Sequence, residues 1–154
     1  MNVLRLLMLQ HDRVEGLLVD LAQSGAGEAR EQALETMVRG LERHFELEES
    51  RFYSAIGPRL VLVTAERFLG EHAQIRELLR GLSAEPHGPM FAEQLEALHD
   101  AVVQHVGDEE IDLFPEVKRR FGVDELDAIG EEIERLVEGE VPPPAGDEPL
   151  SPET

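Results

Sequence analysis

Two histidine–glutamate pairs in this sequence have a spacing that suits metal binding. His44 is followed four residues later by Glu48, and His105 is followed four residues later by Glu109. Residues at positions i and i+4 share one face of an α-helix, so each pair can offer an imidazole and a carboxylate to one cation. The spacing alone carries little weight, because 33 of the 154 residues are Asp or Glu.

The two pairs belong to a longer repeat with an offset of 61 residues. His11 and His72 have the same separation as His44 and His105, and the residues that follow each histidine match its counterpart. The matched segments are HDRVEGLLVDL (11–21) with HAQIRELLRGL (72–82), and HFELEESRFYSAI (44–56) with HVGDEEIDLFPEV (105–117). Each half therefore predicts a helical hairpin with one histidine on its first helix and a His-x3-Glu on its second.

Apolar residues recur at helical spacing along most of the chain, and no strand-like alternation competes with them. Four long amphipathic helices are predicted, with a kink or early end at Pro115, and a shorter fifth helix follows at 123–137. The four long apolar runs cover residues 4–21, 34–56, 61–82 and 91–117. Short loops between such helices favour an all-α, antiparallel, up-down-up-down four-helix bundle. We expect one domain over residues 1–139 and a disordered, proline-rich acidic tail at 140–154.

All four histidines and both glutamates of the repeat fall within the apolar stripes, so they are predicted to face the core. A single core histidine is more often a hydrogen-bonded packing residue than a metal ligand. Two carboxylates buried in a bundle are costly unless they are paired or bind a cation. The repeated set therefore favours a metal site, with these residues as its candidate ligands: His11, His44, Glu48, His72, His105 and Glu109.

Other polar and aromatic residues near the repeat are given lesser roles. Glu49 and Glu110 lie about 100° from the stripe, and we expect them to be solvated. Tyr53 lies roughly 180° from His44 on an ideal helix, which argues against a role at the metal. Surface positions are predicted for His87 and His99, although Glu96 and His99 form a single Glu-x2-His of the ferritin type. The residues expected to wall the site, or simply to pack, are Phe45, Phe52, Leu113 and Phe114.

Composition narrows the function further. The formal net charge is −19, which repels phosphate backbones and anionic lipids and argues against nucleic-acid or membrane partners. The chain has no cysteine, so a metal must be held by nitrogen and oxygen. No apolar run has the length of a membrane span or the form of a signal peptide. A soluble cytoplasmic protein is expected.

Taken together, these motifs resemble the hemerythrin-like, HHE cation-binding family over about residues 5–120. The similarity rests on His11, on HFELE at 44–48, on EHAQI at 71–75 and on HVGDEEIDLFP at 105–115. The resemblance implies a four-helix bundle that holds two iron ions in an oxo- or hydroxo-bridged, non-heme di-iron centre. It also implies terminal histidine ligands at 11, 44, 72 and 105, with Glu48 and Glu109 as bridging carboxylates.

The sequence departs from the oxygen-carrying members of that family in two places. Position 76, where those members have a further histidine, is Arg76, and the last motif is His-x3-Glu instead of His-x4-Asp. If both glutamates bridge, each metal has two nitrogen and two oxygen ligands from the protein and keeps open positions. Arg76 is expected either to stabilise a bound anion or to form a salt bridge with an acidic neighbour.

Open positions on both metals favour reaction with peroxide, O2 or NO over reversible oxygen storage. We therefore expect a protein that binds or processes such a small ligand, with a catalase-like activity or a role in the response to oxidative or nitrosative stress as the specific forms of this expectation. Two alternatives stay open: a non-catalytic iron or oxygen sensor, and a structural site filled by zinc. Whether the protein is an enzyme is not decided by the sequence.

Overall fold

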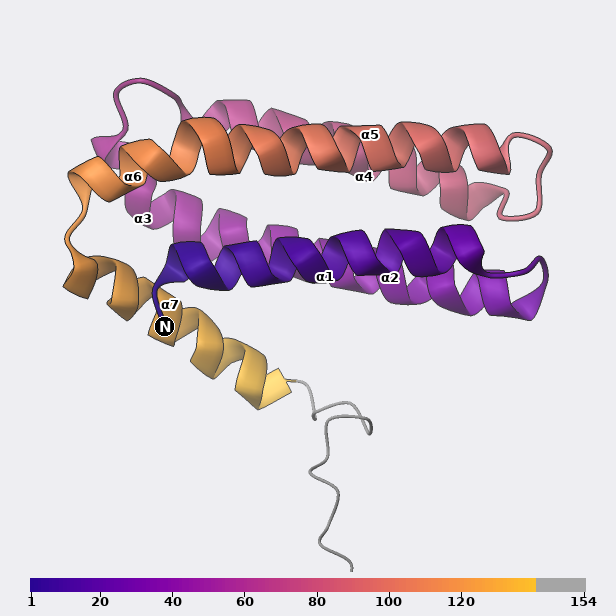
Figure 1. Cartoon of the computed structure of the whole chain (residues 1–154), viewed down its shortest axis with the longest axis horizontal. Helices are drawn as coiled ribbons and strands as arrows, with labels where there is room; N and C mark the ends of the chain where they lie inside the picture. Colours follow the sequence, from indigo (N-terminus) through magenta and orange to yellow (C-terminus); the bar gives the residue numbers. More distant parts are fainter. Residues whose placement is uncertain (141–154) are drawn as a thin grey trace, which may run out of the picture.

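The computed structural model describes residues 1–140, which form a long bundle of helices (Figure 1). Successive long helices run antiparallel, and the α1–α2 and α4–α5 turns lie at the same end of the bundle (Figure 1). The long helices are α1 (Val3–Gln23), α2 (Glu28–Leu47), α4 (Ala65–Ala84) and α5 (Phe91–Asp108). This arrangement confirms the predicted up-down-up-down bundle. Within residues 1–140, none of the helices combines the length and the apolar character that a membrane crossing requires.

Local signals at the ends of α1 and α2 explain where these helices begin. The side chain of Asn2 accepts a hydrogen bond from the backbone N–H of Leu4 at 2.8 Å and so caps α1. Gly27, immediately before α2, has a φ of 95°, a backbone conformation that residues with a Cβ rarely adopt. The turn of the first hairpin therefore depends on a glycine at this position.

Both second helices of the hairpins widen into π-helix at their glutamate. After α2 the chain continues as η1 (Glu48–Tyr53), α3 (Ser54–Ile56) and the 3₁₀ turn η2 (Gly57–Arg59). After α5 it continues as η3 (Glu109–Leu113) and α6 (Phe114–Arg120). The chain does not end its helix at Pro115, because the wide turn makes this proline one of the first residues of α6, where no backbone donor is needed. π-Helical turns are rare and occur frequently at functional sites.

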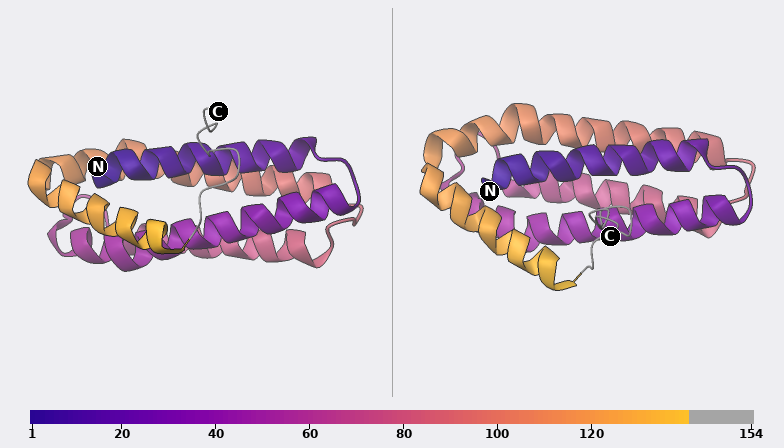
Figure 2. Two further views of the ribbon diagram at one scale, coloured as in Figure 1. Left: turned by 90° about the horizontal axis from the view of Figure 1, so that it is seen from below. Right: turned by 60° about the horizontal axis from the view of Figure 1, so that its bottom comes forward.

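The fifth helix, α7 (Val123–Glu140), turns back from the end of α6 and crosses the start of α1 (Figure 2). The N-terminus lies beside it: the Met1 amino group forms an ion pair with Glu134 at 3.0 Å. Gly130 allows this close contact, because a Cβ on it would lie 1.8 Å from the carbonyl oxygen of Met1. The prediction of a fifth helix at 123–137 is confirmed. Residues 141–154 of the predicted tail lie outside the described residues.

The third predicted helix starts later than its apolar pattern suggested. Val61 and Leu62 are exposed and belong to the segment that connects η2 to α4. Their backbone N–H groups, with that of Val63, donate to the carboxylate of Glu116, which is fully buried and also accepts from Arg120. A buried side chain far away in the sequence therefore holds this segment out of the helix.

The hydrophobic core is divided into two clusters along the bundle. One cluster gathers the start of α1, the π-helices, α6 and α7, and includes Leu7 and Phe68. The other occupies the end with the hairpin turns and includes Val14 and Ile75. His11 falls between Leu7 and Val14, and His72 falls between Phe68 and Ile75. The layer between the two clusters is therefore where the histidines of the repeat lie.

Candidate metal centre

The six candidate ligands meet in this polar layer. His11 comes from α1, His44 from α2, His72 from α4 and His105 from α5, while Glu48 and Glu109 are the first residues of η1 and η3. None of the six is more than 5% exposed. Burial of four imidazoles and two carboxylates in one layer is unusual, because ionisable groups are rarely buried without partners.

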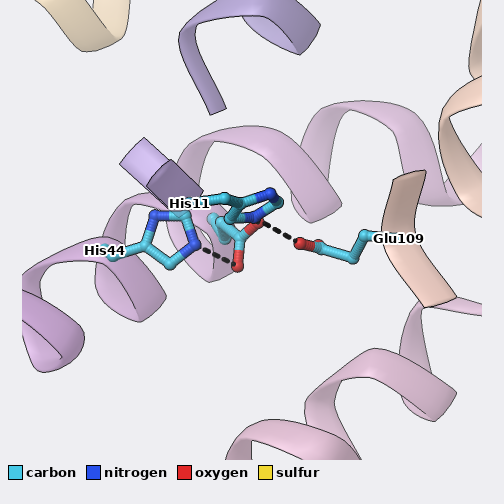
Figure 3. Close-up of side chains that lie close together, drawn as sticks. His11, His44 and Glu109 are labelled. Atoms are coloured by element: carbon cyan, nitrogen blue, oxygen red, sulfur yellow. Dashed lines mark ion pairs between the residues drawn. The ribbon is translucent and has the colours of Figure 1, made fainter. Parts of the chain in front are cut away.

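Two groups of ligand atoms can be distinguished within the layer. His11, His44, Glu48 and Glu109 place one donor atom each within 4.8 Å of one another, and so do Glu48, His72 and His105. In the first group, His11 Nε2 lies 2.9 Å from Glu109 Oε1, and His44 Nε2 lies 3.1 Å from Glu48 Oε1. Figure 3 shows His11, His44 and Glu109 pointing toward one another from three different elements. Glu48 belongs to both groups and so connects them.

In each of the four histidines of the layer, the outer ring nitrogen lies 2.7 Å from an oxygen acceptor. His11 Nδ1 contacts Glu110 and His72 Nδ1 contacts Glu49. His44 Nδ1 contacts Gln10 and His105 Nδ1 contacts Glu71. Because carboxylate and amide oxygens accept, each Nδ1 carries a proton and each Nε2 faces the layer, where it can bind a cation once it has lost its own proton. The expectation that Glu49 and Glu110 are solvated is therefore wrong: both orient a ring, although they are partly exposed.

Tyr53 also reaches the centre, contrary to the sequence-based expectation. Its hydroxyl donates to Glu109 Oε2 at 2.5 Å and lies 3.2 Å from His72 Nε2 and 3.4 Å from Glu48 Oε1. The expectation failed because it assumed an ideal α-helix, whereas η1 is a π-helix whose wider turn rotates residue 53 inward. Nothing in the sequence marks this turn, apart from the aromatic residue at the same place in both repeats.

Aromatic rings enclose the layer, in agreement with the predicted wall. The ring of Phe45 stacks on His72 with centroids 3.9 Å apart, and Phe114 lies parallel to His11 at 6.2 Å. Phe52 meets the edge of Phe114, and Leu113 is fully buried. His87 and His99 are exposed, as predicted. Arg76 forms ion pairs with Glu42 and Glu49 and so takes the salt-bridge role that was one of its two expected roles.

The electrostatics of the layer call for positive charge. Burial alone would lower the pKa of His11, but the carboxylates of Glu109 and Glu48 raise it to about 11. Burial also opposes the charge of His105, yet Glu48 and Glu71 raise its pKa to about 10. For Glu109, burial and the negative charge of Glu48 raise the pKa to about 7. A metal cation would replace the protons that these values describe, since ligands release protons when metal binds.

Four buried polar atoms give a direct test of whether a cation fits. His11 Nε2, His44 Nε2, Glu48 Oε2 and Glu109 Oε1 make no well-aligned hydrogen bond, although His11 Nε2 lies 2.9 Å from Glu109 Oε1. Buried polar atoms that are incompletely satisfied are costly, so the convergence of these four needs an explanation. Two imidazole nitrogens and two carboxylate oxygens that converge on one volume form a donor set suited to Fe, Zn or other borderline cations. The residues present therefore fit a metal.

The fold and the cluster define a helical-bundle protein with a buried cation site, and comparisons with known proteins agree. A family model described as hemerythrin HHE cation binding domain matches residues 2–117. The chain belongs to this family, as its motifs predicted.

Two individual proteins illustrate the similarity. A crystal structure of a hemerythrin HHE cation binding domain-containing protein from Mycobacterium kansasii superposes with a TM-score of 0.80 at 22% identity, over 90% of this chain and 86% of that chain. A protein named DNA nickase from Nostoc sp. (strain PCC 7120 / SAG 25.82 / UTEX 2576) is 23% identical over 128 residues. This match covers 82% of the present chain but only 36% of the nickase, so the chain spans about a third of that relative's length.

Proposed function

We propose that the layer holds a non-heme di-iron centre that binds or processes O2, NO or peroxide. His11 and His44 would hold one ion and His72 and His105 the other, with Glu48 and Glu109 between them. The observation that carries this proposal is the set of four buried histidines and two buried glutamates with their Nε2 and carboxylate atoms turned inward. Iron would supply the Lewis-acid and redox chemistry.

The surrounding residues would orient the ligands and keep water out. Carboxylate or amide partners on each Nδ1 fix the ring and strengthen Nε2 as a ligand. Phe45 and Phe114 cover two of the rings and exclude solvent. Tyr53 would add a phenol oxygen at the His72–His105 end, since its hydroxyl lies at a spacing typical of atoms that share one ion. In the metal-free protein this phenol keeps its proton and donates it in a hydrogen bond to Glu109 Oε2.

Metal analysis together with an optical spectrum of the aerobic protein tests this proposal. We expect about two irons per chain, as in other di-iron bundles, together with charge-transfer bands from bridging oxygen and from the Tyr53 phenolate. Loss of only the lower-energy phenolate band in Tyr53→Phe would assign that band. Zinc alone at full occupancy, or no metal in protein expressed with iron, would rule out the di-iron proposal.

A second candidate is a non-catalytic iron or oxygen sensor. It is favoured by the division of the core, because the polar layer separates two apolar clusters and metal occupancy would control whether they act together. Stopped-flow mixing of the iron-loaded protein with hydrogen peroxide separates the candidates. Sustained turnover supports an enzyme, whereas a single stoichiometric bleach supports a sensor.

A further inference from the structure

The two helical hairpins meet along two seams, α1 against α5 and α2 against α4 (Figure 1). At the level of the centre, the α2–α4 seam is hollowed on its outer side. This hollow has a volume of about 630 Å³ and is lined by charged residues that include Glu42, Glu46, Glu49 and Arg76. None of the six candidate ligands lines this hollow, so it is separate from the metal centre itself.

Only a thin layer separates this hollow from the histidines. Glu49 Oε2, in the wall of the hollow, also accepts from His72 Nδ1 at 2.7 Å. The Arg76 guanidinium bridges the seam, with Nε 3.1 Å from Glu42 Oε2 and Nη1 2.8 Å from Glu49 Oε2. Its central carbon lies 5.2 Å from the centre of the Phe45 ring, which in turn stacks on His72.

A second, inner cavity lies against Phe45. Its volume is about 10 Å³, which is close to the room for one water-sized molecule. Three of the histidines, His11, His44 and His105, line it together with Phe45 and aliphatic side chains such as Ile75. Such a lining suits a small neutral molecule better than an anion, because a charge here would lose its hydration.

The α1–α5 seam lacks an equivalent closure. Position 15, which the repeat matches to Arg76, is an exposed glutamate, and position 106, which it matches to Phe45, is valine. The hollow found on that seam lies near Phe91 and Leu95, away from the level of the centre. The features of an access route therefore coincide on one seam.

We propose that small neutral molecules such as O2 or NO reach the centre through the α2–α4 seam, and that Arg76 over Phe45 is the closure of this route. The proposal rests on the proposed function. When Arg76 leaves Glu49, the Phe45 ring is free to turn and the hollow joins the inner cavity. No covalent step is involved, so Arg76 acts on rates of access and not on the strength of binding.

The kinetic test uses NO as the probe and the iron(II)-loaded protein. Arg76→Ala should raise the association and dissociation rate constants together, on the order of tenfold if the open state is populated to about a tenth in the native protein. Their ratio, the affinity, should change much less than either rate constant, because Arg76 reaches His72 only through Glu49. Arg76→Lys keeps the charge near Glu49 but not the planar group over Phe45. Its rate constants should lie between those of the native protein and those of Arg76→Ala. Unchanged rates in Arg76→Ala, or a change in dissociation alone, would overturn the proposal.

Arg30 supplies a matched control. Its guanidinium lies 4.1 Å over the Phe91 ring and bonds to the Pro86 carbonyl, so it makes the same kind of contact far from the centre. Arg30→Ala should therefore leave both NO rate constants as they are. Arg30 also lines the hollow on the α1–α5 seam, so an equal acceleration in Arg30→Ala would show that loosening of the bundle or access through that seam, and not the closure, controls the rates.

A second measurement does not need iron. Dissolved O2 speeds the relaxation of nearby methyl protons, so NMR of the zinc-loaded or metal-free protein locates it. Methyl groups of Leu41, Ile75 and Val102 line the inner cavity, and they should relax faster with O2 than the buried Ile133. The size of this effect should be the same in Arg76→Ala, because the closure sets the rates of entry and exit and not the occupancy. The strongest effect at Val19 and Leu95 would instead place access on the other seam. Failure of the protein to bind metal would refute the di-iron proposal without affecting this readout.

Discussion

The two hairpins of the bundle place the same ligands in the same way but surround them differently. In both halves a π-helix begins at the glutamate of His-x3-Glu. The acidic residue that follows this glutamate forms a hydrogen bond with the first histidine of the other hairpin: Glu49 with His72, and Glu110 with His11. Two pairs of matched positions carry different residues. Gln10 contacts His44 where Glu71 contacts His105. Tyr53 packs on His72 where Phe114 packs on His11. The inner ligands thus follow the repeat, while the residues around them make the two ends of the centre unequal.

The largest effect is expected where the halves are alike. Glu48→Ala and Glu109→Ala should each lose most of the bound metal, because each change removes a buried carboxylate at ion-pair distance from a histidine of each pair. Metal content of the purified variants measures this, with Glu46→Ala on the exposed side of α2 as the control. Full metal content in both variants would refute the assignment of these residues as ligands.

An exchange of Gln10 and Glu71 tests the first difference between the halves. Glu71→Gln should weaken metal binding at His105 by about 10–100-fold, the usual effect of losing such a partner. Gln10→Glu should strengthen binding at His44. Titration against a chelator measures both affinities, and Gln74→Glu, at an exposed position of the same helix as Glu71, is the control. If both exchanges shift affinity in the same direction, the two histidines are not distinguished by these partners.

Moving the hydroxyl tests the second difference. Tyr53→Phe leaves Glu109 Oε2 without its donor, at a cost of about 1–3 kcal/mol in the stability of the metal-free protein. Phe114→Tyr should recover part of this loss, because the repeat directs its hydroxyl toward Glu48 Oε2, which has no hydrogen-bond partner. Thermal unfolding of both single variants and of the double variant measures these changes. Equal losses of stability in Tyr53→Phe and Phe114→Tyr would contradict this expectation, because a hydroxyl at position 114 would then not be stabilising.

The smallest effect concerns a contact that only the second half possesses. Position 116 is the buried Glu116, whereas the repeat places the exposed Ala55 in the first half. Despite burial, hydrogen bonds from Leu62, Val61, Arg120 and Val63 hold the pKa of Glu116 at about 2, below the ordinary 4.5. Its contribution to stability is therefore present above pH 4.5 and is lost as the pH falls toward 2.

Glu116→Gln should consequently lower the unfolding temperature at neutral pH, and the difference from the native protein should shrink between pH 4.5 and 2. Unfolding followed by circular dichroism across this pH range measures the effect. A difference that is constant with pH would show that the charge of Glu116 does not contribute.

Much of this molecule could be predicted from its sequence, because the information lies in periodicity and repetition. The apolar stripes predicted the bundle, and their coincidence with the four histidines predicted which residues meet in the core. What failed depended on geometry that propensity does not record. The inward position of Tyr53 requires a π-helical turn, and the late start of α4 requires a carboxylate from α6. Glu49 and Glu110 were assigned to solvent for the same reason, since an ideal helical wheel does not show the neighbouring hairpin.

The polar layer that divides the core also bears on cooperativity. The apolar side chains of the described residues form two separate clusters, and the buried histidines and glutamates lie between them. With a metal in place, bonds from all four long helices would tie the two ends into one unit that melts in a single transition. Without it, the end that carries α7 and the end that carries the hairpin turns can unfold at different temperatures. Metal would then decide whether this chain behaves as one folding unit or two.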